Sequence, residues 1–135
     1  MYQPKKFKHK KSQKGANYRK IKISKLTNEP NVRYIKLISI ACGTLNSNHF
    51  KMIKLNVQKR IKKRGKFFIC IFPQTPISKK PLSVRMGKGK GPVDHWSVKI
   101  GLGQLLCKIE ISNKYAGILA FKSIQYKLPF LTKII

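Results

Sequence analysis

The sequence predicts an α+β fold: a two-layer sandwich of a mixed or antiparallel sheet and two helices. Short apolar runs rich in β-branched residues predict strands, and two stretches with apolar residues at helical spacing predict helices. Two neighbouring alternating runs predict a β-hairpin. The expected order is β-α-β-loop-β-β-α-β. The length of 135 residues suits one domain, which we place at residues 26–135 behind a basic extended arm at residues 1–25.

The first strand is expected at residues 33–41, RYIKLISIA, and ends at Gly43. Asn46 or Ser47 can cap the helix that follows, and Gly65 is expected to stop it. One face of this helix is apolar and the remainder is strongly basic, which predicts a helix packed on the core with cations outward. The apolar positions are Phe50, Ile53, Val57 and Ile61.

Residues 66–72, KFFICIF, form a continuous apolar run between Gly65 and Pro73. Such a run is typical of a central strand that is buried on both faces. The next residues, 73–81, are rich in proline and predict a loop.

Residues 96–100 and 105–111 alternate between apolar and polar positions around the sequence Gly-Leu-Gly at 101–103. This pattern predicts the β-hairpin with one buried face, and it places Cys107 toward the core. Ser112 or Asn113 can cap a second helix at about residues 114–126. Pro129 prevents its continuation, and residues 129–135 predict a last strand. The second helix turns Ile118, Phe121 and Ile124 to one side.

Charge dominates the composition, with 31 Lys and Arg against 3 Asp and Glu and a formal net charge of +28. A compact chain of this charge repels itself and needs a polyanion, and nucleic acid is the default partner. An anionic membrane surface is the alternative, but the basic runs lack the clean amphipathic helical pattern of a surface-seeking peptide. The apolar runs are too short to span a bilayer, and the start of the chain predicts no signal peptide.

The arm at residues 1–25 is dense in cations and has no acid. We expect it to be extended and to order on a polyanion; the alternative is a solvated disordered tail. Tyr2, Phe7 and Tyr18 are candidates either for stacking on bases or for packing against the protein body.

The sequence predicts no enzyme, no cofactor and no metal site. The three acids, Glu29, Asp94 and Glu110, lie in different segments, and no histidine has an obvious orienting partner. The cysteines Cys42, Cys70 and Cys107 are widely spaced without a C-x-x-C pair. We therefore expect them to be buried apolar residues in strands rather than metal ligands.

The stretch VRMGKGKGPVDHW at residues 84–96 looks at first like a nucleotide-binding loop. It has no Ser or Thr after either lysine for magnesium, Pro92 stands where a third Gly is required, and a strand rather than a helix follows. The glycines instead allow a backbone to approach a surface closely, and the lysines supply charge for phosphates. We interpret it as a loop that enters folded RNA; a flexible surface hinge is the alternative.

At this point the sequence resembles the large-subunit ribosomal protein L16 (uL16) family. The residues that carry the resemblance are Arg85-Met86-Gly87-Lys88-Gly89-Lys90-Gly91 with Trp96, preceded by residues 80–84, KPLSV. A second motif lies at residues 63–73, KRGKFFICIFP, and the start Gln3-Pro4-Lys5-Lys6 agrees with the family's N-terminal arm.

The resemblance implies a compact α+β sandwich that binds large-subunit rRNA and lies beside the aminoacyl-tRNA site near the peptidyl-transferase centre. The implied partners are rRNA, A-site tRNA and neighbouring ribosomal proteins, and we expect no free homo-oligomer. The predicted rRNA-binding residues are Lys5, Lys6, Lys8, Lys10, Lys11, Lys14, Arg19, Lys59, Lys62, Lys63, Arg64 and Lys66. The predicted loop for the rRNA and tRNA site is Arg85, Met86, Gly87, Lys88, Gly89, Lys90 and Gly91.

The sequence departs from the family pattern at Cys42, Thr44 and Asn48, where arginines are usual, so these positions are left out of the predicted set. Lysine, isoleucine and asparagine are plentiful, which is what an A+T-rich coding sequence produces. Together with the absence of a presequence, this favours a protein encoded and used in a mitochondrion, with a plastid or a bacterial cytoplasm as alternatives. A free nucleoid protein and a nucleotide-binding enzyme are the other functional hypotheses.

Overall fold

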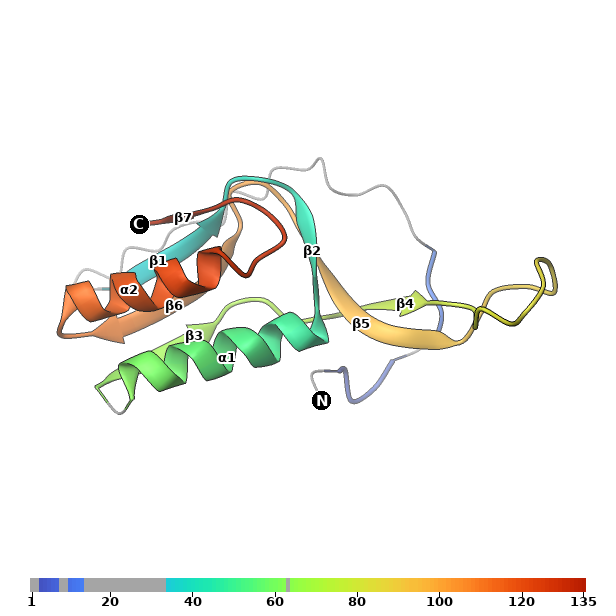
Figure 1. Ribbon diagram of the computed structural model, residues 1–135, viewed down its shortest axis with the longest axis horizontal. Coiled ribbons are helices and arrows are strands. Elements are labelled where there is room, and N and C mark those ends of the chain that lie inside the picture. The colour runs from blue at the N-terminus through green and yellow to red at the C-terminus, as the bar shows by residue number, and fades with distance from the viewer. Residues whose placement is uncertain (1–2, 8–9, 14–33, 63) are drawn as a thin grey trace.

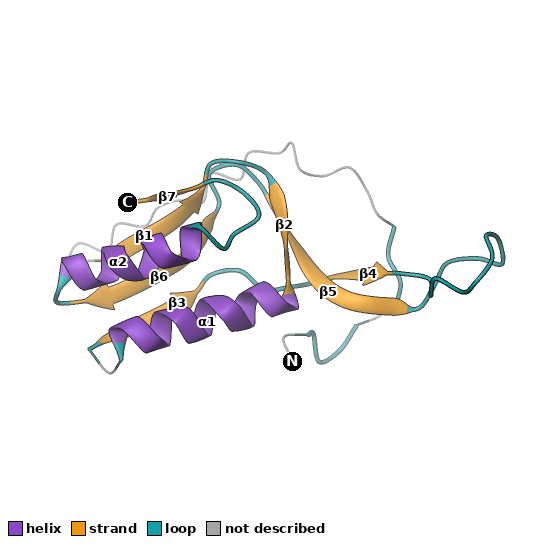
Figure 2. Ribbon diagram, viewed as in Figure 1, coloured by secondary structure: helices purple, strands orange, loops and turns teal. Residues whose placement is uncertain are grey.

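The computed structural model describes residues 3–7, 10–13, 34–62 and 64–135. In this part of the chain two helices and seven strands form an α+β fold, and all strand pairings are antiparallel (Figures 1 and 2). The predicted fold class is confirmed. The elements are β1 (Tyr34–Ser39), β2 (Gly43–Asn46), α1 (Ser47–Ile61), β3 (Gly65–Ile69), β4 (Thr75–Ser78), β5 (Val93–Ile100), β6 (Leu105–Ile111), α2 (Lys114–Gln125) and β7 (Thr132–Ile134).

The strands form two sheets rather than one. The four-stranded sheet has the order β3-β6-β1-β7, and the three-stranded sheet has the order β2-β5-β4. Helices α1 and α2 lie side by side over the four-stranded sheet, while the three-stranded sheet extends away from them (Figure 1). The β4–β5 connection forms the far tip of this extension. The fold thus separates a helix-covered body from a projecting loop.

Both helices bury the faces that their spacing predicts. In α1 the four apolar positions are at most 2 % exposed, and in α2 Phe121 and Ile124 are fully buried while Ile118 is partly buried against the core. Asn46 is the N-cap of α1, and the Asn113 side chain accepts hydrogen bonds from the backbone N–H of Tyr115 and Ala116 in α2. The end of α1 differs from the prediction. The helix ends at Ile61, and Gly65 is already the first residue of β3.

The predicted hairpin of residues 96–100 and 105–111 is wrong. Strand β5 belongs to the three-stranded sheet and β6 to the four-stranded sheet, so the two do not pair. Instead β1 pairs with β6 and β2 pairs with β5 on the two sides of a bend, and the register shifts by one residue at a bulge within the β1–β6 pair. The two bent chains are tied together by the buried Ser39, whose hydroxyl donates to the Gly101 carbonyl at 2.6 Å. Gly101 and Gly103 therefore lie at a bend in a long two-stranded ribbon, and not at the turn of a hairpin.

The alternation in β6 is also interrupted. A bulge opposite Leu37 and Ile38 leaves Leu106 without a counterpart in the register. Leu106 and Cys107 are consequently both buried although they are adjacent, whereas the pattern predicts only Cys107 inward.

Strand β3 lies at the edge of the four-stranded sheet, so the prediction of a central strand buried on both faces is wrong. Its outward side chains remain partly open to solvent, with Phe68 39 % exposed. Phe68 and Tyr34 flank Lys108, whose Nζ lies 5.4 Å and 4.3 Å from the two ring centroids. The attraction between the Lys108 cation and the two aromatic rings favours an outward position for Phe68, although Phe68 belongs to an apolar run.

Two short strands lie where none is expected. Residues 75–78, within the predicted proline-rich loop, form β4, which pairs with one side of β5. Pro76 is tolerated because β4 is an edge strand, where one row of backbone groups needs no partner. Strand β2 follows directly after the predicted end of the first strand at Gly43. Together they hold β5, and with it the projecting loop.

Candidate nucleic-acid interface

The loop at residues 79–92 joins β4 to β5 and projects from the end of the three-stranded sheet (Figure 1). Its neck is closed by a hydrogen bond of 3.1 Å from the Lys79 N–H to the Pro92 carbonyl. Gly91 lies so close to this neck that a Cβ there would be 2.7 Å from the Lys79 carbonyl oxygen. At this position glycine is required by the close approach of the chain's own backbone, whereas the sequence motif predicts close approach to RNA.

The tip of the loop carries the predicted motif on its surface. Residues 81–90 are all exposed, and Met86 is 99 % exposed. Gly87, Lys88 and Gly89 are consecutive residues with positive φ, a conformation that glycine adopts at little cost. A turn from Pro81 to Val84 and a hydrogen bond from the Lys80 ammonium to the Gly87 carbonyl hold this path. Arg85, Met86 and Lys88 are therefore all open to solvent in this loop.

Lys90 faces the arm rather than the tip. Its ammonium donates to the Ser12 carbonyl, and the Lys11 ammonium donates to the Lys90 carbonyl at 2.8 Å. Five residues before Ser12, the Phe7 ring packs edge-to-face on Trp96 of β5, with 5.1 Å between the ring centroids. The described parts of the arm thus lie against the three-stranded sheet and the loop. For Phe7, packing against the protein body is the alternative that the structure supports.

A second group of cations gathers where α1 ends and β3 begins. Lys62 ends the helix with a positive φ of 54°, and the Arg64 N–H returns to the Ile61 carbonyl at 3.1 Å. The last turn of a helix favours cations because its carbonyls carry partial negative charge. This group consists of Lys59, Arg60, Lys62, Arg64 and Lys66, which are all exposed. We call it the basic corner.

The structure separates the two predicted basic regions. The basic corner and the tip of the loop lie at opposite ends of the longest axis of the molecule (Figure 1). Arg60 belongs to the basic corner, although it is absent from the rRNA-binding residues predicted from the sequence. Its position directly after Lys59 in the last turn of α1 could have indicated that it belongs there. The arm residues Lys5, Lys6, Lys10 and Lys11 are exposed. The other predicted positions, Lys8, Lys14, Arg19 and Lys63, lie outside the described residues, as do Tyr2 and Tyr18.

Among the residues that the structure describes, three side chains have pKa values shifted chiefly by burial. Burial lowers the pKa of His49, whose Nδ1 accepts a hydrogen bond of 3.0 Å from the Asn46 backbone N–H at the start of α1. Partial burial of its sulfur raises the pKa of the Cys70 thiol, although the Lys108 ammonium opposes this shift. Deep burial raises the pKa of the Cys107 thiol, and the neighbouring Cys70 thiol raises it further. Both thiols are therefore protonated at neutral pH, which makes them poor nucleophiles and poor metal ligands.

The cysteines differ from the prediction in exposure. Cys107 is buried, Cys42 is half-buried and Cys70, which directly follows β3, is exposed, so only Cys107 matches the expected burial. Within the described ranges, no group of three or more His, Cys, Asp and Glu side chains is placed to hold a metal ion. In the same part of the chain, no helix is long and apolar enough to cross a membrane.

A small α+β domain that exposes cations at both ends and carries few acids has the charge distribution that is typical of ribosomal proteins. The family model described as Ribosomal protein L16p/L10e matches residues 4–135. The chain belongs to this family, and with it to the structural proteins of the large ribosomal subunit.

Relatives from bacteria support the same assignment. The chain is 37 % identical over 135 residues to the large ribosomal subunit protein uL16 of Acinetobacter baylyi, covering all of this chain and 96 % of the relative. It is 38 % identical to uL16 of Wigglesworthia glossinidia brevipalpis with the same coverage. It is also 37 % identical to uL16 of Buchnera aphidicola subsp. Cinara cedri, over 98 % of this chain and 94 % of the relative. These matches favour a ribosomal role over a nucleoid protein or a nucleotide-binding enzyme.

Proposed function

We propose that this chain binds large-subunit rRNA through three basic regions: the arm, the basic corner and the loop at residues 79–92. The observation that carries the proposal is the placement of exposed cations at both ends of an elongated molecule, with only three acids in the whole sequence. Separate cationic ends can contact separate RNA segments, and so fix the orientation of the protein between them.

We further propose that the loop tip faces the A-site tRNA near the peptidyl-transferase centre. The tip combines a guanidinium, an ammonium and a fully exposed methionine on a backbone with three consecutive positive φ values. Arg85 and Lys88 can contact phosphates, and Met86 can pack against an exposed base or sugar. The protein then shapes a site where RNA carries out the chemistry, and it needs no catalytic residue of its own.

The proposal is tested by measuring binding of the full chain to large-subunit rRNA across a range of salt concentrations. Loss of one phosphate contact lowers the slope of log K against log salt by about 1. Substituting both Lys59 and Lys66 by Ala should therefore lower the slope by about 2. The matched control is Lys122→Ala, which removes an exposed lysine on α2 outside the predicted regions and should leave the slope nearly unchanged.

Two results would count against the proposal. If Lys122→Ala reduces the slope as much per lysine as the basic-corner variant does, binding follows net charge and not the basic corner. If the full chain shows no affinity for the RNA even at low salt, rRNA binding itself is wrong.

The setting is a separate proposal. We propose a mitochondrial ribosome, on the basis of the lysine- and isoleucine-rich composition that an A+T-rich genome produces; the bacterial relatives favour a bacterial ribosome as the alternative. Sedimentation of the tagged chain from fractionated source cells distinguishes the two. The chain is expected with mitochondrial large subunits, and recovery with large subunits of another compartment would contradict this.

A further inference from the structure

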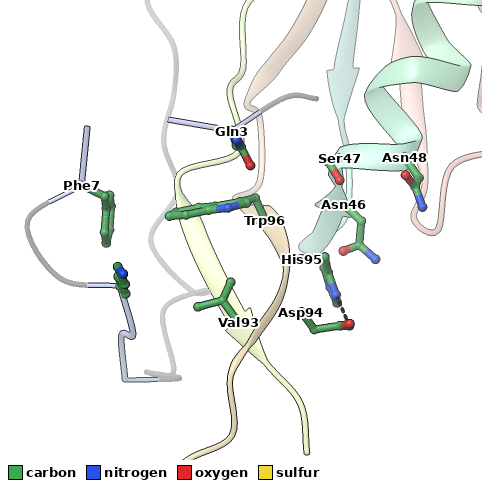
Figure 3. Close-up of a pocket in the computed structure, with 10 residues that line it drawn as sticks. Gln3, Phe7, Asn46, Ser47, Asn48, Val93, Asp94, His95 and Trp96 are labelled. Carbon is green, nitrogen blue, oxygen red and sulfur yellow. Dashed lines mark hydrogen bonds and ion pairs between the residues drawn. The ribbon is translucent and has the colours of Figure 1, made fainter. Parts of the chain in front are cut away.

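We infer that the pocket between the arm, the start of α1 and β5 is a binding site for one unstacked nucleobase of RNA. This inference rests on the proposed RNA-binding function and adds a site of different chemistry, since base recognition differs from phosphate neutralisation. The pocket has a volume of about 590 Å³, and the described residues that line it include none from the loop at residues 79–92 or from the basic corner (Figure 3).

The topology explains why a pocket forms at this place. Strand β2 pairs with β5 only as far as Asn46 opposite Ser97, because the chain then turns into α1 at Ser47. The remaining stretch of β5, residues 93–96, continues past the end of β2. The pocket opens at this step, and Phe7 of the arm closes one side of it. Its volume is in the range of ordinary small-molecule sites.

One wall of the pocket is aromatic. Trp96 of β5 and Phe7 of the arm meet edge-to-face, with an angle of 76° between their planes. Trp96 is only half-buried and Phe7 is 44 % exposed, so both rings keep surface that faces the pocket or solvent. Stacking of an unpaired base on an aromatic side chain is the usual way in which proteins bind single-stranded RNA.

The opposite wall is polar but not strongly cationic. Figure 3 shows Asn46 and Asn48 at the start of α1 across from Trp96, and Gln3 beside the indole ring. Side-chain amides both donate and accept hydrogen bonds, which matches the mixed pattern on the edge of a base. Among the residues that the structure describes, Lys10 is the lysine that lines the pocket.

The acid in the pocket argues against a phosphate site. Asp94 accepts a hydrogen bond from His95 Nδ1 at 2.8 Å, and its carboxylate is partly exposed to the pocket. A carboxylate repels a phosphate but can accept a hydrogen bond from the N–H groups of a base. We therefore place the base between Trp96 and the polar wall, with the sugar-phosphate chain passing outside, near Lys10.

The chain offers a built-in reporter for this site, because Trp96 is its only tryptophan. The full-length protein is titrated with a fluorescently labelled oligoadenylate while two signals are followed. Anisotropy of the label reports binding of the RNA, and Trp96 emission reports stacking in the pocket. We expect the indole emission to be quenched in parallel with the rise in anisotropy. Phe7→Ala should weaken binding of the oligoadenylate roughly tenfold, because an aromatic contact is lost. Asn48→Ala should also weaken binding, because a polar contact to the base is lost.

Two controls separate stacking from charge. Inorganic polyphosphate neutralises the same cations but has no base, so it should bind without quenching Trp96. Lys59→Ala in the basic corner should lower the affinity for the oligonucleotide and leave the quenching at saturation unchanged.

The outcomes are distinct. Anisotropy that rises while Trp96 emission stays constant would overturn the nucleobase site and leave RNA binding in place. Equal quenching by polyphosphate would also overturn it, because the signal would then arise from charge alone. A flat anisotropy at low salt would overturn both the site and the proposed function.

Discussion

The proposed role of Arg85 is in binding and not in the stability of the fold. Its side chain is exposed, and it belongs to the loop at residues 79–92, which projects away from the helix-covered body. Arg85→Ala should change the free energy of unfolding by no more than about 0.5 kcal/mol, as is usual for surface substitutions. It should instead impair tRNA binding at the A site or a late step in assembly of the large subunit.

Arg85→Lys is the matched variant for this prediction, since it keeps the charge and loses the planar fork of donors. Thermal unfolding and incorporation into large subunits are measured for both variants. A large drop in melting temperature for Arg85→Ala would show that this arginine is structural.

At Gly65, the neighbouring backbone leaves no room for a side chain. A Cβ at this position would lie 2.5 Å from the Glu110 carbonyl oxygen in the paired strand β6. Gly65→Ala should therefore cost about 1–3 kcal/mol in the free energy of unfolding, measured by denaturant titration.

Gly117→Ala is the control for Gly65→Ala. There the nearest atom, Ile35 Cδ1, also lies 2.5 Å from the added Cβ, but it is the end of a flexible side chain. A helix interior also favours Ala over Gly by up to about 1 kcal/mol. A loss at Gly65 no larger than that at Gly117 would contradict the steric reason.

Helix α1 shows which part of an element the sequence predicts well. The burial of its apolar face follows directly from the 3.6-residue period, and Ile53 is 2 % exposed while Leu55 is 66 % exposed. Ile53→Ala should destabilise the protein by about 2–5 kcal/mol. Leu55→Ala, in the same helix, should change stability by less than about 0.5 kcal/mol. Similar losses in chemical denaturation for the two variants would mean that α1 packs by another face.

The start of α1 adds a dependence on pH. His49 Nδ1 accepts the Asn46 N–H, so the folded protein needs this imidazole neutral, and burial lowers its pKa below the ordinary value of 6.5. The unfolded chain therefore binds a proton at a higher pH than the folded chain does. Stability from this group is complete above about pH 6.5 and is lost as the pH falls toward the lower folded pKa.

The contribution of His49 is isolated by comparison with His49→Gln, which keeps a side-chain acceptor at the same helical position but does not titrate. Unfolding free energies of both proteins are measured from pH 7.5 to about pH 5. The native protein should lose more stability on acidification than the variant. Parallel curves would rule out His49 as the titrating group.

Pairing between elements was the part that local patterns predicted least. Alternation correctly placed strands at residues 96–100 and 105–111, but adjacency in sequence wrongly suggested that they pair. Their true partners, β2 and β1, are distant in sequence, and the bend at Ser39 and Gly101 is held by hydrogen bonds between remote segments. The outward face of β3 was missed for a related reason, because Lys108, which lies between Tyr34 and Phe68, comes from a neighbouring strand.

For the molecule as a whole, the sequence motifs predicted the family and the exposed loop. The structure adds that this loop and the basic corner lie far apart. Charge counting predicts a polyanion partner but contains no information about where the cations gather. The basic corner and the loop tip lie at opposite ends, and the arm reaches the neck of the loop through Lys11, Ser12 and Lys90. The pocket beside Trp96 had no sequence signature, because the arm, β5 and the start of α1 contribute to it together.

A reconstruction of the large ribosomal subunit that contains this chain, with the side chains resolved, tests the proposed function most directly. We predict large-subunit RNA against both the basic corner and the loop at residues 79–92, with Arg85 directed toward the A-site tRNA. A map in which either end of the molecule contacts only protein or solvent would contradict the proposed mode of binding.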